Sequence, residues 1–163
     1  MSITFNADEI FEMAEEIEKN GAKFYRKAAE NVSDKDIEKL LLELAVTEDG
    51  HLQTFRQMRQ QLSGPEKTQN TFDPDSEAAL YLQAMAEARG YEGKKSPTVE
   101  LTGKESVKEV FEIALNAEKE SVVFYFGLKS LVSEKAGKDK VEKVITEELS
   151  HITTLLSQLK ALN

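Results

Sequence analysis

The sequence contains no cysteine. Disulfide bonds, zinc ribbons, thiolate nucleophiles and cysteine-bound iron–sulfur clusters are therefore excluded from this chain. Long hydrophobic runs are also missing, because no window approaches the roughly eighteen uncharged apolar residues that a membrane-spanning helix needs. Residues 1–9 lack the basic and apolar regions of a secretory signal peptide, so we expect a cytoplasmic protein.

Positive charge is in short supply. The chain has 21 Lys and Arg against 30 Asp and Glu, which gives a net charge of −9. A basic surface is what displaces counterions from a phosphate backbone, so nucleic acid is not an expected partner. An anionic membrane surface is likewise not an expected partner, because it would repel this acidic chain.

What is present is a helical pattern. The chain has 163 residues, of which 40% are apolar and 31% charged, as in one soluble domain spanning 1–163. Apolar residues at helical spacing predict four long helices, at 7–31, 35–62, 107–133 and 138–161. Capping boxes are expected at Asn6 with Glu9 and at Ser106 with Glu109. A shorter helix is predicted at 76–89, inside a crossover segment that spans 64–105.

The two halves of the chain resemble each other. When residues 6–63 are compared without gaps with residues 106–163, fifteen of fifty-eight positions are identical. Chance identity between unrelated chains of this composition is about 6–8%. The sequence therefore predicts an all-α four-helix bundle made of two repeated helical hairpins, 6–63 and 106–163.

Carboxylates and imidazoles recur inside this repeat. A glutamate interrupts the apolar stripe of the first helix of each hairpin, and a Glu-x-x-His follows thirty residues later. The chain has only two histidines, and both belong to these motifs. The candidate metal-binding residues are Glu18, Glu48, His51, Glu118, Glu148 and His151.

Helix geometry brings these residues to one level of the bundle. Glu18 lies about 14 residues before the turn, or ~21 Å along the helix, and Glu48 lies about 15 residues after it, or ~22 Å. Burying four carboxylates without a cation is very costly, and two divalent metals would neutralise them. Carboxylate and imidazole without thiolate suit iron or manganese, with zinc as a further alternative. Glu48 and Glu148 would bridge the metals, and Glu18 and Glu118 would be terminal ligands.

Other interpretations of these residues remain open. The histidines and glutamates could be ordinary hydrogen-bonded or solvated groups on helix surfaces. Tyr25 and Tyr125 lie two turns beyond Glu18 and Glu118, either as core aromatics or as groups that bond the carboxylates or carry a radical. Glu15 is either a solvated charge or an additional ligand.

The duplicated Glu and Glu-x-x-His pattern resembles the ferritin-like di-iron carboxylate proteins. The segment Ile17–Ala29 (IEKNGAKFYRKAA) and the segment Glu48–His51 (EDGH) are similar to the short rubrerythrin-like proteins. This resemblance implies a ferritin-like fold with two iron ions held by the six candidate residues. Rubrerythrins carry a four-cysteine rubredoxin domain and an additional glutamate one turn from a terminal ligand. Here the cysteines are absent, and Ser121 and Gly21 stand one turn after Glu118 and Glu18.

The resemblance implies an oxidoreductase that reduces hydrogen peroxide or dioxygen with electrons from an external donor protein. An iron-handling protein of the ferroxidase type, which oxidises iron once and does not turn over, would use the same ligands. A metal-free helical interaction module is the third alternative. Bundles of this kind often form homodimers, and we expect one here.

Overall fold

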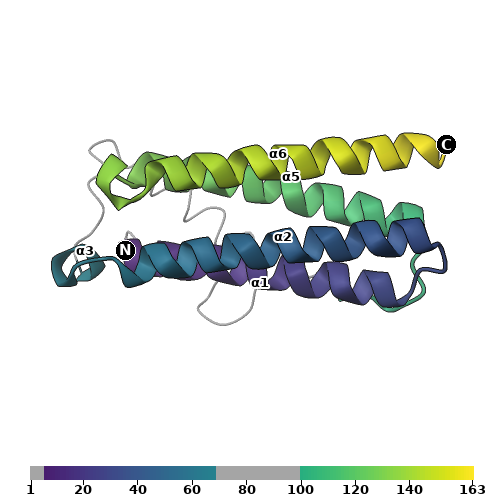
Figure 1. Ribbon diagram of the computed structural model, residues 1–163, viewed down its shortest axis with the longest axis horizontal. Coiled ribbons are helices and arrows are strands. Elements are labelled where there is room, and N and C mark those ends of the chain that lie inside the picture. Colours follow the sequence, from purple (N-terminus) through teal and green to yellow (C-terminus); the bar gives the residue numbers. More distant parts are fainter. Residues whose placement is uncertain (1–5, 69–99) are drawn as a thin grey trace, which may run out of the picture.

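Two antiparallel helical hairpins form the molecule, as the computed structural model shows for residues 6–68 and 100–163 (Figure 1). The first hairpin contains α1 (Ala7–Glu30) and α2 (Lys35–Gln60), and the second contains α5 (Val107–Leu131) and α6 (Lys138–Ala161). All four predicted helix starts coincide with the observed ones, and the predicted ends lie within two residues. The predicted all-α four-helix bundle is thus the observed architecture.

The helices begin where the sequence provides caps. The Asn6 side chain accepts the Glu9 amide at 2.9 Å, and the Glu9 carboxylate accepts the Asn6 amide at 2.9 Å, which completes a capping box. Ser106 and Glu109 form the corresponding box at the start of α5. These reciprocal bonds satisfy amide groups that have no partner within the first helical turn.

The connections differ from the prediction in two places. A short helix, α3 (Gly64–Thr68), lies at the start of the crossover segment 64–105, where we predicted no helix. The turn between α5 and α6 contains a 3-10 helix, η1 (Glu134–Ala136), and ends at Gly137 with φ of 102°, a conformation that favours glycine. The helix predicted at 76–89 lies outside the described residues.

Two apolar clusters fill the bundle, one at each end. The first includes Phe11, Phe55, Leu128 and Val141, and the second includes Ala28, Leu41, Phe111 and Leu155. Each cluster takes residues from all four long helices. On every long helix the candidate metal-binding residues fall between the positions that supply the first cluster and those that supply the second. The polar residues therefore form a layer enclosed between two apolar clusters.

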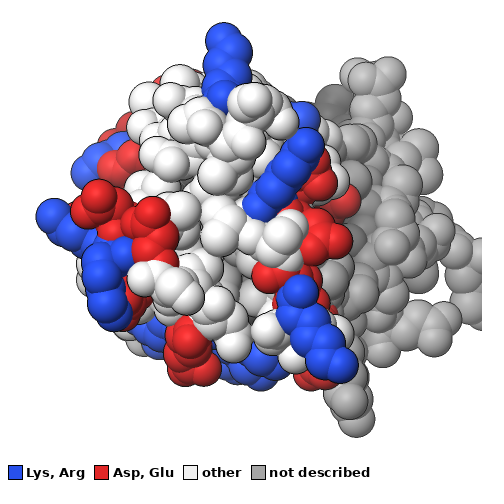
Figure 2. All heavy atoms as spheres, turned by 90° about the vertical axis from the view of Figure 1, so that its right-hand side faces the viewer, with Lys and Arg blue, Asp and Glu red and all other residues white. Residues whose placement is uncertain are grey.

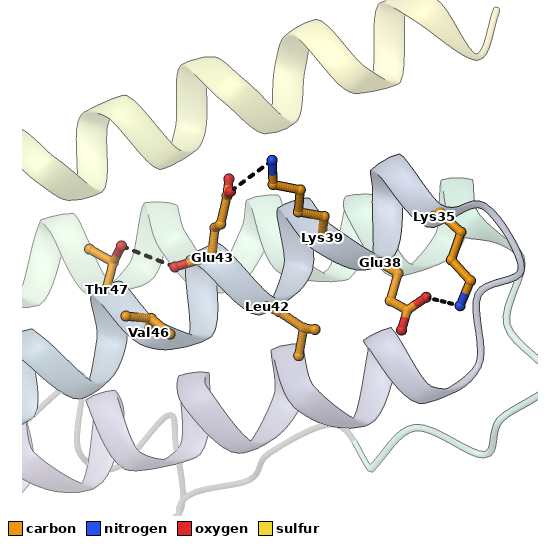
Figure 3. Close-up of a pocket in the computed structure, with 7 residues that line it drawn as sticks. All are labelled: Lys35, Glu38, Lys39, Leu42, Glu43, Val46 and Thr47. Atoms are coloured by element: carbon orange, nitrogen blue, oxygen red, sulfur yellow. Dashed lines mark hydrogen bonds and ion pairs between the residues drawn. The ribbon is translucent and has the colours of Figure 1, made fainter.

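The surface carries charges of both signs. At the end of the bundle where α1 passes into α2, basic and acidic side chains are interspersed around an uncharged centre (Figure 2). A cavity of about 670 Å³ lies on the outer face of α2, lined by side chains from Lys35 to Thr47, and none of the six candidate residues lines it (Figure 3). No helix within residues 6–68 and 100–163 is both long and apolar enough to cross a membrane.

Candidate metal centre

Each long helix contributes to one buried cluster of carboxylates and imidazoles. The first helix of each hairpin supplies one glutamate, and the second supplies a glutamate and, one turn later, a histidine. Glu18 and Glu148 are completely inaccessible to solvent. All six candidate residues are buried, namely Glu18, Glu48, His51, Glu118, Glu148 and His151. The alternative in which they are solvated surface groups does not hold for this structure.

The cluster divides into two overlapping groups of four. In each group, one ligand-type atom per residue lies within 4.8 Å of the others. One group surrounds His51 with Glu18, Glu48 and Glu148, and the other surrounds His151 with Glu118, Glu48 and Glu148. Glu48 and Glu148 belong to both groups, so they occupy the places that bridging carboxylates would take between two cations.

The atoms that face the centre lack hydrogen-bond partners. Within residues 6–68 and 100–163, no hydrogen-bond partner is found for six buried atoms: the Nδ1 atoms of both histidines, both oxygens of Glu148 and one oxygen each of Glu18 and Glu48. Buried polar groups are nearly always satisfied, so several such atoms pointing at one centre call for an unseen partner. Oxygen and nitrogen donors without thiolate fit two divalent metal ions of the iron or manganese type.

Burial and crowding alter the protonation of the cluster. Burial raises the pKa of Glu18, of Glu48 and of Glu118, the last to about 8, because it disfavours the charged form. For His51 burial acts in the opposite direction, but the neighbouring carboxylates of Glu148 and Glu18 outweigh it and raise the pKa to about 11.

The remaining two groups follow the same logic. Burial tends to lower the pKa of His151, yet the carboxylates of Glu118, Glu148 and Glu48 raise it to about 12. Glu148 lies between both histidines, and although burial tends to raise its pKa, its close neighbours Glu118, His151 and His51 hold that pKa well below its usual value. The metal-free cluster therefore retains protons that bound cations would displace.

The two tyrosines connect the hairpins. The Tyr25 hydroxyl donates to Glu118, and the Tyr125 hydroxyl donates to Glu18, so each tyrosine bonds the glutamate of the opposite hairpin. Both rings are buried, and burial raises the pKa of both hydroxyls well above its usual value. The neutral hydroxyls thus bond one oxygen of each terminal carboxylate, and the other oxygen of Glu18 is buried without a hydrogen bond to the described residues. This crossed pairing does not follow from the sequence spacing.

Two further glutamates near the cluster, Glu15 and Glu147, make contacts that the sequence did not predict. Glu15 lies 3.6 Å from Arg59 and 4.0 Å from Arg56, and it belongs to neither four-residue group. Glu147, which we did not predict, lies 2.7 Å from Nε2 of His51. No signal in the sequence marks it, because its contact joins α2 and α6, which belong to different hairpins.

A glycine makes room for one shared carboxylate. A Cβ atom at position 21 would lie 2.8 Å from Oε2 of Glu48, closer than van der Waals contact allows. We expect Gly21→Ala to displace that carboxylate and weaken metal binding by at least about tenfold, equivalent to roughly 1.4 kcal/mol. Isothermal titration of the metal-free variant with Zn²⁺ measures this loss.

Gly50→Ala is the matched control, because a Cβ there meets no atom of the described part of the chain within 4 Å. Both substitutions remove a glycine from a helix interior, which by itself favours the helix by roughly 0.5–1 kcal/mol. The control should therefore gain stability towards urea and bind Zn²⁺ as the parent protein does. Equal Zn²⁺ affinities for the two variants would show that Gly21 has no role at the site.

Comparisons with known proteins agree with this geometry. The family model for rubrerythrin matches residues 9–159. A crystal structure from Thermotoga maritima, described as that of a candidate ferritin-like diiron-carboxylate protein, aligns over 98% of this chain and 98% of its own. The two chains share 28% sequence identity, and the TM-score is 0.71. This match confirms the predicted ferritin-like fold. Curated proteins gave no match.

Proposed function

Since the chain belongs to the rubrerythrin family, we propose that it is a non-haem di-iron oxidoreductase that reduces hydrogen peroxide or dioxygen. One observation carries this proposal: two four-residue donor groups share Glu48 and Glu148. Such sharing suits a pair of metal ions that act on one small molecule. His51 and Glu18 would complete the site of one ion, and His151 and Glu118 that of the other.

The chain supplies the environment for this chemistry. Two iron ions, when bound, would provide two electrons and polarise the O–O bond. Glu48 and Glu148 would hold them at a fixed separation, and the tyrosine hydroxyls on Glu18 and Glu118 would keep the terminal carboxylates oriented. The apolar clusters on either side exclude bulk water, which strengthens electrostatic interactions within the layer. Manganese and zinc are the alternative metals for the same donors.

Electrons must come from outside this chain, because it has no cysteine with which to hold a rubredoxin-type centre. We therefore include an external electron-donor protein in the proposal, together with a cytoplasmic location and a homodimer. Nucleic acid and membranes are not among the proposed partners.

One observation favours a second function. Gly21 and Ser121 stand where rubrerythrins place an additional glutamate, and the Ser121 hydroxyl donates to the Ala117 carbonyl at 3.0 Å, within its own helix. A site with only the six candidate residues, and without that additional glutamate, would suit an iron-handling protein that oxidises ferrous iron once.

Steady-state peroxide consumption separates these two functions. We expect iron-loaded protein, supplied with a chemical reductant, to consume many equivalents of hydrogen peroxide per chain. An iron-handling protein would consume peroxide only until its two ferrous ions were oxidised. Unchanged thermal stability and no bound metal after anaerobic iron addition would instead favour the metal-free interaction module.

A further inference from the structure

The two histidines of the cluster differ in the contacts of Nε2, the ring nitrogen that faces away from the centre. Nδ1 of His51 faces the centre, 2.8 Å from Glu148 and 3.4 Å from Glu18. Its other nitrogen, Nε2, lies 2.7 Å from Oε2 of Glu147 on α6. The His51 side chain is 3% exposed, whereas Glu147 is 40% exposed. A half-exposed carboxylate thus contacts the outer edge of a buried imidazole.

The repeat breaks at the equivalent position of the other hairpin. Position 147 corresponds to position 47, where the chain has threonine. The Thr47 hydroxyl donates to the Glu43 carbonyl at 3.2 Å, within its own helix (Figure 3). Among the described residues, the ion pairs of His151 all involve Nδ1. The two histidines therefore face the same kinds of donor atoms through Nδ1, but among the described residues only His51 has a carboxylate at Nε2.

An outer carboxylate changes how an imidazole binds a metal. It accepts the Nε2 proton, fixes the tautomer that presents the Nδ1 lone pair to the centre, and restricts rotation of the ring. It also makes the ligand more basic. Loss of such a partner typically costs 10- to 100-fold in metal affinity. His51 has this support from Glu147, and position 47 offers no carboxylate to His151.

We infer that Glu147 is a positioning residue that makes the two metal positions unequal, so that the ion at His51 binds more tightly than the ion at His151. The inference rests on the proposed di-metal site and concerns binding, whatever reaction follows. Glu147 acts through His51 and does not belong to either donor group.

Metal titration of the metal-free protein tests this inference. Co²⁺ is added stepwise, followed by its visible absorption, in competition with a chelator of known affinity. We expect two binding events of different affinity in the parent protein. Glu147→Thr should weaken the tighter event by roughly 10- to 100-fold and bring the two affinities together. Thr47→Glu alone should strengthen the weaker event.

The double variant Thr47→Glu with Glu147→Thr tests whether Glu147 acts by orienting a histidine ligand or only by stabilising the fold. It moves the outer carboxylate from His51 to His151, so the separation between the two events should return. Damage to the fold would not restore that separation. Glu142→Thr is the matched control, since Glu142 is 58% exposed on the same helix and pairs with Lys129 at 3.1 Å. It removes one charge from α6 and should leave both events nearly unchanged.

The outcomes distinguish this inference from the proposed function. If Glu147→Thr binds two Co²⁺ ions with the affinities of the Glu142→Thr control, the positioning role is overturned and the di-metal site stands. If the parent protein shows two events of equal affinity, the inequality itself is wrong. If the parent protein binds no Co²⁺, Fe²⁺ or Mn²⁺, both the inference and the proposed function fall.

Discussion

Glu148→Ala should abolish the binding of both metal ions and, with it, all peroxide turnover. Glu148 is completely buried and places one oxygen 2.8 Å from Nδ1 of His51 and the other 3.2 Å from Nδ1 of His151. Neither oxygen has a hydrogen-bond partner among the described residues. Because both donor groups include this side chain, its removal takes a donor from each position at once. Metal content per purified chain, by mass spectrometry, should fall from two ions towards zero.

Glu118→Ala provides the comparison that makes this result specific. Glu118 belongs only to the group around His151, so its loss should remove one ion and leave the position at His51 occupied. Both variants lose a buried glutamate, and any general loss of packing should affect them alike. Two ions retained by the Glu148→Ala variant would contradict the shared-ligand assignment, as would an equal loss of metal in the two variants.

The bundle and the cluster could be predicted from the sequence because both follow from the apolar periodicity and the length of individual helices. The apolar stripe of a helix shows which face is buried, and 1.5 Å per residue fixes the level of Glu18 relative to Glu48. A repeat then requires the second hairpin to follow the first. The six side chains therefore come to one layer of the bundle, where they form the two four-residue groups.

Side-chain contacts between helices of different hairpins could not be predicted from the periodicity of single helices. Whether Tyr25 bonds the glutamate of its own hairpin or of the other depends on how the two hairpins face each other. The contact between Glu147 and His51 also joins different hairpins, and Glu147 stands among many glutamates on a half-exposed face. The short helix Gly64–Thr68 was missed because glycine and proline at its start were interpreted as the end of α2.

The metal-free protein should become less stable as the pH rises, and bound metal should remove that dependence. Burial raises the pKa of Glu18, Glu48 and Glu118, and the surrounding carboxylates raise those of His51 and His151. For a group whose pKa is raised on folding, the stabilisation is complete below the unfolded pKa and disappears as the pH rises through the folded pKa.

The expected window follows from these values. Stabilisation from Glu118 should fade between its ordinary pKa of 4.5 and about 8, and that from His51 between 6.5 and about 11. Glu148, with its lowered pKa, acts oppositely and loses its contribution only in acid. Near neutral pH the folded metal-free chain therefore binds more protons than the unfolded chain. Each such proton lowers the free energy of unfolding by about 1.4 kcal/mol per pH unit.

Urea denaturation at pH 6 and at pH 9, with a chelator and with saturating metal, measures the effect. We expect the chelated protein to lose stability between the two pH values. Each ion at one hundred times its dissociation constant should add about 2.7 kcal/mol. At a fixed metal concentration the gain should be larger at pH 9 than at pH 6, because metals bind deprotonated ligands and their dissociation constants therefore fall as the pH rises.

A variant with both histidines replaced, His51→Gln with His151→Gln, is the matched control. It removes the two groups that hold protons to the highest pH, so the chelated variant should lose less stability than the chelated parent between pH 6 and pH 9. Stability of the chelated parent that is constant or rises over this range would contradict the protonation of the cluster. In that case the buried carboxylates would have to be compensated by something other than protons, and competition between protons and metal for the same donors could not explain how the site assembles.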